Sequence, residues 1–333
     1  MRVLFAGSPE IAVPALKALC AIEGIELAGV LTNPDTPKGR HGAPQPTDVG
    51  EAAVALYAGT QSASCGEASR AIPILKPEKL DAFAREQVGA LKCDLLISFA
   101  YGRIFGPMFM ALFPLGGINI HPSLLPKYRG PTPVQAAILN RDKVTGITVQ
   151  WLAKEMDCGD IIIQEELPLS GKETADSLSV VIAAKAAVML PEALKKIATG
   201  NARGIPQSEI KTSAGYCSLI SKEDGQIDWG RSTEEIEAKI RAFTPWPLCR
   251  TIHDGRELII LKADVFNDDE TAVLAKLAGK PGQVLGSDKN YGILIRTGKG
   301  ILAVTQLQYQ AKKALFWRDF LNGARDFSGS ILG

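Results

Sequence analysis

The sequence has few of the residues from which metal sites are usually built. Its 333 residues include only three histidines and six cysteines. The cysteines, at positions 20, 65, 93, 158, 217 and 249, form no C-x-x-C pair and have no histidine at the spacing of zinc ligands. We therefore expect no metal site, and we expect the cysteines to be reduced thiols.

Strong charge and long apolar segments are also lacking. The formal net charge is +1, which neither indicates nor excludes a nucleic-acid partner, so any basic surface must be local. The apolar stretch after Met1 is too short for a signal peptide, and no segment approaches the roughly 18 apolar residues of a membrane span. These absences predict a cytoplasmic protein.

What the sequence does contain is the composition of a soluble globular protein. Hydrophobic residues make up 46% of the chain and charged residues 22%. A chain of 333 residues exceeds the size at which a single hydrophobic core usually stops growing. Two domains are therefore expected.

The N-terminal part alternates between short apolar runs and segments with helical periodicity. Strands are predicted at 3–6, 27–32, 72–75, 94–100, 118–121 and 147–152, and helices at 11–20, 77–91 and 174–199. This alternation is typical of an α/β, Rossmann-like fold with a mostly parallel sheet between helices. The turn at Gly7-Ser-Pro-Glu10 lacks the G-x-G-x-x-G spacing of a dinucleotide site, and we interpret it as a plain tight turn.

The composition changes near residue 200. Residues 200–214 contain many turn formers, which predicts a linker between a domain at 1–199 and another at 215–333. In the latter we expect a helix at 233–242 and strands at 249–253, 257–265, 282–285, 292–297 and 300–307. Asp254-Gly255 predicts a tight hairpin, and Trp246, between two prolines, is expected in a rigid buried turn. Short antiparallel strands with little helix predict a small OB-like β-barrel.

Three polar residues form the strongest candidate for a catalytic site. Asn119 and His121 are two residues apart at the end of a predicted strand, so both can face one cleft. Ligands in open parallel sheets bind beyond the carboxyl ends of the strands. Asp157 stands in Asp-Cys-Gly, which taken alone is more typical of a simple turn than of a catalytic residue.

An amide, an imidazole and a carboxylate suit the transfer of a one-carbon acyl group between amines. Asn119 can donate a hydrogen bond to the oxygen that becomes negative, and His121 can take and return a proton near neutral pH. Asp157 can orient the imidazole. The alternative is a nucleophilic serine at Ser123, but the chain has no G-x-S-x-G motif.

Asn119-Ile-His121, the tract Ser123-Leu-Leu-Pro126 and Asp157 before Cys158-Gly159 together resemble the folate-dependent formyltransferases. The resemblance implies catalytic roles for Asn119, His121 and Asp157, and 10-formyltetrahydrofolate as co-substrate without a metal. It also implies that residues 99–104 form the second wall of the folate pocket. The side chains expected to line this pocket are Ser123, Leu124, Leu125, Pro126, Phe99, Tyr101 and Ile104.

The motif leaves several acceptors open: glycinamide ribonucleotide, an amino-sugar nucleotide, water, or the amino group of methionyl-tRNA. The C-terminal region resembles that of family members that formylate methionyl-tRNA, in Gln226–Trp229, in Ile240–Pro247 and around Lys312-Lys313. This resemblance implies initiator methionyl-tRNA as acceptor and a role in translation initiation. We separately expect a monomer. A module that binds RNA or folate without turnover is the alternative from another class, but all three catalytic residues are present.

Two basic regions are expected to contact the tRNA. The loop at 33–46 carries Lys38 and Arg40, and by the resemblance it enters the acceptor end of the tRNA; by itself it would be an ordinary surface loop. From Lys289 to the C-terminus there are seven basic residues, Lys312 and Lys313 among them, and two acidic ones, a local excess of five. Such an excess is expected for phosphate contacts. An insertion at 59–66 has no assigned purpose.

Overall fold

The structure is a computed structural model that describes residues 1–37, 42–60, 72–266, 279–324 and 326–333. The chain divides into two compact units, which we describe separately. The first unit contains Met1–Pro133, Val144–Pro168 and Ser179–Ser218. The second contains Val134–Lys143, Leu169–Leu178 and Leu219–Gly333.

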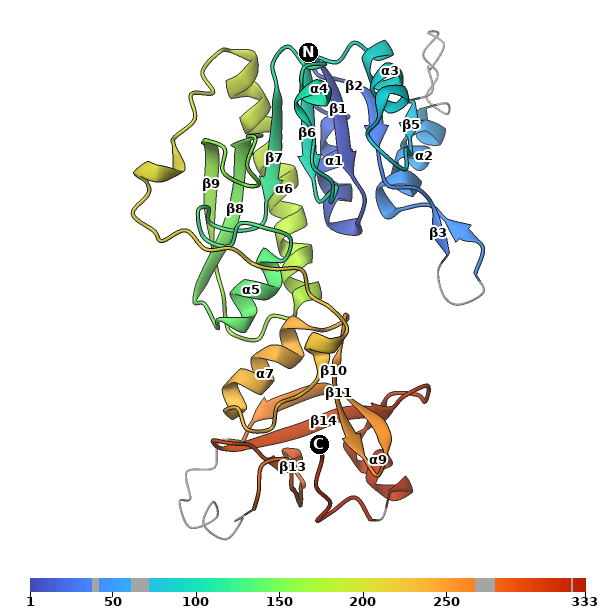
Figure 1. Cartoon of the computed structure of the whole chain (residues 1–333), viewed down its shortest axis with the longest axis vertical. Helices are drawn as coiled ribbons and strands as arrows, with labels where there is room; N and C mark the ends of the chain where they lie inside the picture. Colours follow the sequence, from blue (N-terminus) through green and yellow to red (C-terminus); the bar gives the residue numbers. More distant parts are fainter. Residues whose placement is uncertain (38–41, 61–71, 267–278, 325) are drawn as a thin grey trace. The chain divides into compact units, whose positions relative to one another are not determined.

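The first unit is built on a seven-stranded sheet in the order β5-β2-β1-β6-β7-β8-β9 (Figure 1). The strands are β1 (Arg2–Gly7), β2 (Glu26–Leu31), β5 (Ile74–Leu75), β6 (Leu95–Phe99), β7 (Gly117–His121), β8 (Val144–Trp151) and β9 (Ile161–Pro168). Strands β5, β2, β1, β6 and β7 run parallel, β8 is antiparallel to β7, and β9 is antiparallel to β8. The predicted mostly parallel sheet is confirmed. Strand β9 was not predicted, because it lies at the sheet edge and three of its eight residues are polar.

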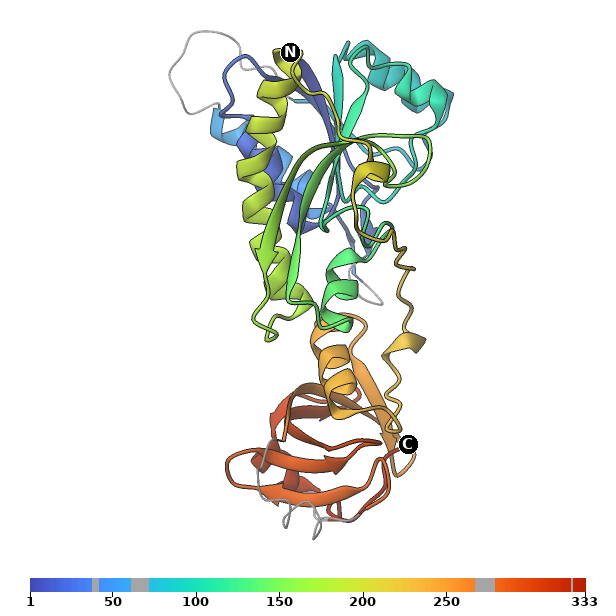
Figure 2. The ribbon, with the colours of Figure 1, turned by 90° about the vertical axis from the view of Figure 1, so that its left-hand side faces the viewer.

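Helices cover both faces of this sheet, with α1 (Val13–Leu19) and α6 (Ala175–Ala198) on one face and α3 (Ala82–Ala90) and α4 (Pro107–Met110) on the other (Figures 1 and 2). Helix α2 (Asp48–Thr60) packs against α1. Because helices lie on both sides of β1, its residues 3–6 are completely buried. This explains why the strand appears in the sequence as a continuous apolar run.

Helix α6 is long and apolar enough, by length and composition alone, to cross a membrane, with a mean hydropathy of 1.6 over its best 18-residue window. The sequence predicts this helix at 174–199, but a search for uninterrupted apolar runs did not mark it as long and apolar enough for a membrane span. Within the fold, 44% of that window is buried. The buried side chains, such as Ile182, Ala186 and Leu190, recur at a helical spacing and face the core.

The second unit contains an antiparallel sheet in the order β10-β11-β14-β13-β12, with β15 paired to β14. Its elements are α5 (Pro133–Leu139), α7 (Thr233–Ala242), β10 (Cys249–His253), β11 (Arg256–Val265), β12 (Val284–Asp288), β13 (Gly292–Arg296), β14 (Ile301–Tyr309), β15 (Leu315–Phe316) and α9 (Trp317–Gly323). The predicted hairpin is confirmed, since His253 pairs with Arg256 across Asp254 and Gly255, both with positive φ. The predicted second domain of antiparallel strands is likewise confirmed.

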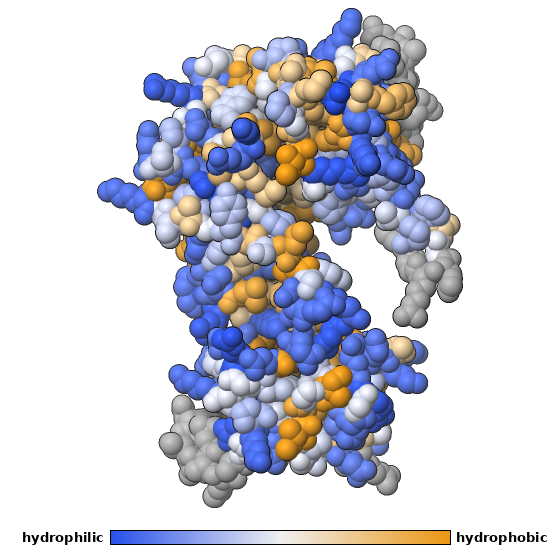
Figure 3. Space-filling model, viewed as in Figure 1, coloured by the Kyte–Doolittle hydropathy of each residue, from blue (hydrophilic) through white to orange (hydrophobic). Residues whose placement is uncertain are grey.

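Helix α7 has the bounds that the sequence predicts. Its first turn is closed by a capping box, in which Ser232 accepts from the backbone of Glu235 and the Glu235 carboxylate accepts from Ser232. The prediction for Trp246 was wrong, because 57% of its side chain is exposed. Phe243 takes the buried position at the end of the helix instead. Figure 3 shows one face of the surface, on which hydrophilic residues separate small apolar patches.

Candidate active site

Strands β7 and β8 place polar side chains on one face of the sheet. The register pairs Asn119 with Gln150 and His121 with Thr148. Since residues two apart on a strand face the same side, these four side chains gather in one place. Gln150, Thr148 and His121 are buried, and Asn119 is half-buried.

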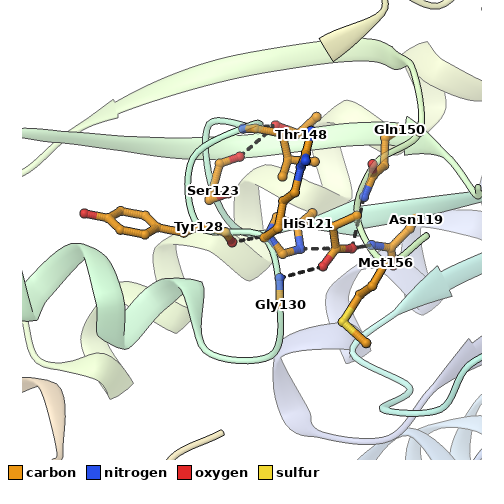
Figure 4. A network of polar contacts seen from close by, with 12 residues as sticks. Asn119, His121, Ser123, Tyr128, Gly130, Thr148, Gln150 and Met156 are labelled. Atoms are coloured by element: carbon orange, nitrogen blue, oxygen red, sulfur yellow. Dashed lines mark hydrogen bonds and ion pairs between the residues drawn. The ribbon is translucent and has the colours of Figure 1, made fainter. Parts of the chain in front are cut away.

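Asp157 is the centre of a hydrogen-bond network at this position. Figure 4 labels the partners that surround its carboxylate, Asn119, His121, Gly130 and Gln150. Its Oδ1 accepts from Asn119 Nδ2 at 3.3 Å and from Gln150 Nε2 at 3.1 Å. Its Oδ2 accepts from the backbone N–H of Gly130 at 2.8 Å. The imidazole Nδ1 of His121 lies 3.5 Å from Oδ1. The structure thus brings the three predicted catalytic side chains together, although Asp157 lies 38 residues after Asn119 in the chain.

The turn that carries Asp157 has an unusual backbone. Asp157 has a φ of 54°, in the left-handed region that costs a residue with a side chain roughly 1 kcal/mol. Two residues later, a Cβ on Gly159 would lie 1.7 Å from the backbone oxygen of Trp151. Glycine is therefore required at this position, which gives a physical reason for the Asp-x-Gly spacing.

The tautomer of His121 follows from its contacts. Nε2 lies 2.8 Å from the backbone oxygen of Tyr128, and since a carbonyl can only accept, Nε2 carries a hydrogen. Nδ1 is then free to take up a proton on the side of Asp157. Burial lowers the pKa of His121, while the Asp157 carboxylate and the Tyr128 carbonyl act to raise it. The imidazole is therefore neutral near pH 7 and can act as a base.

The expected folate loop at 123–126 is fixed by hydrogen bonds to β8 and β9. Thr148 Oγ1 donates to the backbone oxygen of Ser123 at 2.7 Å and accepts from the backbone N–H of Leu125. Gln164 Nε2 donates to the oxygen of Leu125 at 3.0 Å. Leu125 and Pro126 are buried, and Leu124 is half-buried. The Ser123 hydroxyl is fully buried and donates to the oxygen of Lys127 at 2.6 Å, so it is not directed at a reacting carbon.

The residues of the second expected wall differ in their exposure. Phe99 and Tyr101 are completely or almost completely buried, and Tyr101 stacks on Phe105 in the core. Ile104 is 73% exposed. Of the three, Ile104 therefore presents its side chain to solvent, and the others can offer mainly backbone.

The expected tRNA contacts divide between the two units. Lys312 and Lys313 lie exposed in the turn between β14 and β15. Lys38, Arg40 and most of the insertion at 59–66 lie outside the described residues. The described parts of the basic loop form a short ribbon of β3 (Thr36–Pro37) and β4 (Pro44–Gln45).

Two site residues were missed by sequence reasoning. Gln150 lies on the predicted strand at 147–152, and its alternation with Thr148 could have indicated it. Gln207 lies in the segment predicted as a linker, yet it is 6% exposed and donates to the backbone oxygens of Asp157 and Gly159. Nothing in the local sequence indicates this contact.

The remaining groups that could bind a metal ion or react as nucleophiles are carboxylates, imidazoles and thiols. In the described part of the chain, no group of three or more histidine, cysteine, aspartate or glutamate side chains is arranged to hold a metal ion. Cys158, next to Asp157, lies 3.4 Å from the hydroxyl of Tyr216. Burial raises the pKa of the Cys93 thiol to about 11 and that of Cys249 to about 12, so both are protonated at neutral pH.

The fold and the Asn-His-Asp site define a class of protein. Residues 1–194 match the family described as formyl transferase, and residues 219–325 match the formyl transferase C-terminal domain. The chain belongs to the formyl transferase family.

Several proteins are similar along the whole chain. The methionyl-tRNA formyltransferase of Treponema denticola is 50% identical over 327 residues, covering 98% of both chains. That of Borrelia duttonii is 38% identical over 333 residues, covering 99% of both. An N-formyltransferase from Helicobacter canadensis, solved with folinic acid and dTDP-3-aminofucose, has a TM-score of 0.61 at 20% identity and covers 91% of this chain and 98% of its own. At that identity the likeness shows the shared fold.

Proposed function

We propose that this protein transfers the formyl group of 10-formyltetrahydrofolate to the α-amino group of initiator methionyl-tRNA, in the cytoplasm and for translation initiation. The observation that carries the proposal is the network in which Asn119, His121 and Gln150 surround the Asp157 carboxylate. The identity of 50% with a methionyl-tRNA formyltransferase, over almost all of both chains, supports the choice of acceptor.

The side chains of the site can perform the reaction without a covalent intermediate. The folate co-substrate supplies a formyl group on nitrogen. The Asn119 amide has one N–H directed to Asp157 and a second with which to stabilise the oxygen that becomes negative when the amine attacks. His121 Nδ1 accepts the proton that the attacking amine loses and returns a proton to the leaving nitrogen. Asp157 holds the imidazole and stabilises its protonated form.

The two regions of the chain have separate tasks in this proposal. Residues 1–199 carry catalysis, with the folate pocket between the loop 123–126 and residues 99–104. Residues 200–214 link this domain to 215–333, which contacts the tRNA through Lys312 and Lys313, while Lys38 and Arg40 contact its acceptor end. We propose that the protein acts as a monomer.

Formylation assays test the proposal directly. Purified protein, 10-formyltetrahydrofolate and charged initiator tRNA should give formylmethionyl-tRNA, and an amino-sugar nucleotide should remain unmodified. Asn119→Ala should lower kcat about 100- to 1,000-fold, the loss typical of an oxyanion donor. The control Asn140→Ala removes an amide that donates within its own turn to Ala136 and should keep full activity. Formylation of the amino sugar alone, or normal turnover by Asn119→Ala, would contradict the proposal.

A further inference from the structure

Gln207 joins the two segments that define the geometry of the active site. Its Nε2 donates to the backbone oxygens of Asp157 and Gly159, each at 2.8 Å, and lies 3.2 Å from Gln150 Oε1. Its Oε1 accepts from Arg129 Nε at 3.0 Å and from a second nitrogen of the same guanidinium at 2.6 Å. Donor and acceptor ends of one amide are thus both satisfied inside the fold.

The orientation of this amide is fixed by chemistry. A guanidinium can only donate, so the atom facing Arg129 is the oxygen, and the carbonyls of Asp157 and Gly159 can only accept, so the atom facing them is the nitrogen. A flipped amide would lose all of these bonds. Gln207 therefore has one functional orientation.

Each segment held by Gln207 contacts the catalytic groups directly. Tyr128 and Gly130, on either side of Arg129, supply the carbonyl that fixes the His121 tautomer and the N–H that binds the Asp157 carboxylate. On the other side, the two bonded carbonyls belong to the turn in which Asp157 has its left-handed backbone. The Gln207 side chain thus sets the distance between two segments. One is the loop of Tyr128 to Gly130, which contacts His121, and the other is the turn that carries the Asp157 carboxylate.

We infer that Gln207 is a positioning residue, which holds the turn of Asp157 and the loop of Arg129 at the separation that formyl transfer requires. The inference rests on the proposed function, because it gives Gln207 its effect through Asp157. Glutamine suits the task because only an amide supplies two donors and an acceptor in one plane without adding a charge. A buried residue of this kind affects the rate through geometry rather than through contact with substrate.

Steady-state formylation kinetics of Gln207→Ala test the inference. We expect kcat to fall about 10- to 100-fold, as for displacements on the order of 1 Å at a catalytic centre, with little change in KM for either substrate. The acid limb of the pH profile should also move to lower pH, because a displaced carboxylate no longer raises the pKa of His121. Gln87→Ala, at an exposed glutamine of α3, is the matched control and should behave as the unmodified protein.

A double variant separates positioning from other roles. In an Asp157→Asn background, Gln207→Ala should lower kcat by no more than about twofold, because the group through which it acts is already impaired. The inference would be overturned if the two substitutions lowered kcat by independent factors that multiply in the double variant. A normal kcat in Gln207→Ala alone would also overturn it. If the unmodified protein does not formylate methionyl-tRNA, or Asp157→Asn is fully active, the proposed function fails instead.

Folding is controlled with a second substitution. Gln207→Glu keeps the shape and the acceptor for Arg129 but replaces both N–H donors by an oxygen that faces the carbonyls of Asp157 and Gly159, so it should show at least the same loss of kcat. Circular dichroism at the assay temperature checks that the variant is folded. Recovery of full activity by this variant would show that the bonds to Asp157 and Gly159 do not matter. If neither variant folds, Gln207 is a stability residue and the inference is wrong.

Discussion

Proton transfer at this site is decided by the two nitrogens of His121. The carbonyl of Tyr128 holds the hydrogen on Nε2, and Nδ1 faces the Asp157 carboxylate at 3.5 Å, beyond a good hydrogen bond. In the neutral state two acceptors therefore face each other. Protonation of Nδ1 turns this into an attraction, which is the property required of a base that must hold a proton briefly.

The first prediction concerns the titration of His121. Burial lowers its pKa, so we expect the midpoint below the ordinary value of about 6.5. Asp157→Asn should lower it further, because the carboxylate favours the protonated imidazole. NMR titration measures both, and with three histidines in the chain the signal can be assigned with His121→Gln. A midpoint at or above 6.5, or an upward shift in Asp157→Asn, would contradict this account.

At the level of elements, the pairing of β7 with β8 builds one half of the site. The alternation on β7 predicted that Asn119 and His121 share a face, because this depends only on local geometry. The contact with Asp157 depends on the antiparallel return of β8, which the periodicity of the sequence did not specify. The catalytic role of Asp157 was predicted from the resemblance to the folate-dependent formyltransferases. Gln207 lies 50 residues after Asp157, and neither the periodicity nor the resemblance predicted it.

The same limits explain the errors of fold prediction. Buried parallel strands such as β1 are uniform apolar runs and were found, whereas the edge strand β9 mixes polar and apolar residues and was missed. Trp246 was assigned to a buried turn because it lies between two prolines. Burial depends on which residue fills the core, and here Phe243 does so.

The turn after β8 supplies the second prediction. Gly159→Ala would place a Cβ against the Trp151 oxygen, so the Asp157 turn must shift, and we expect a loss of at least about 2 kcal/mol in unfolding free energy together with a strong loss of kcat. Gly89→Ala is the control, since its Cβ meets ordinary contact in helix α3 and should leave stability unchanged or slightly higher. Urea unfolding and formylation assays measure both. Equal behaviour of the two variants would contradict the steric argument.

For the whole molecule, charge is distributed unevenly although the net charge is +1. The C-terminal stretch from Lys289 holds an excess of five positive charges, so the remainder of the chain is slightly acidic. Phosphate contacts made by such a region set affinity and register, while the Asn-His-Asp site sets the rate. Substitutions in the two regions should therefore affect different kinetic parameters.

The last prediction follows from this separation. Each lost phosphate contact should reduce the slope of log affinity against log salt by about 1, so Lys312→Ala/Lys313→Ala should flatten the slope for methionyl-tRNA by up to about 2. KM for the tRNA should rise at physiological salt and kcat should stay unchanged, because neither lysine belongs to the catalytic network. The control Lys17→Ala/Lys195→Ala removes two exposed charges from the first unit and should leave the slope unaltered. Binding titrations at several salt concentrations decide the matter, and an equal change in both double variants would mean that general charge, rather than contacts at the β14–β15 turn, attracts the tRNA.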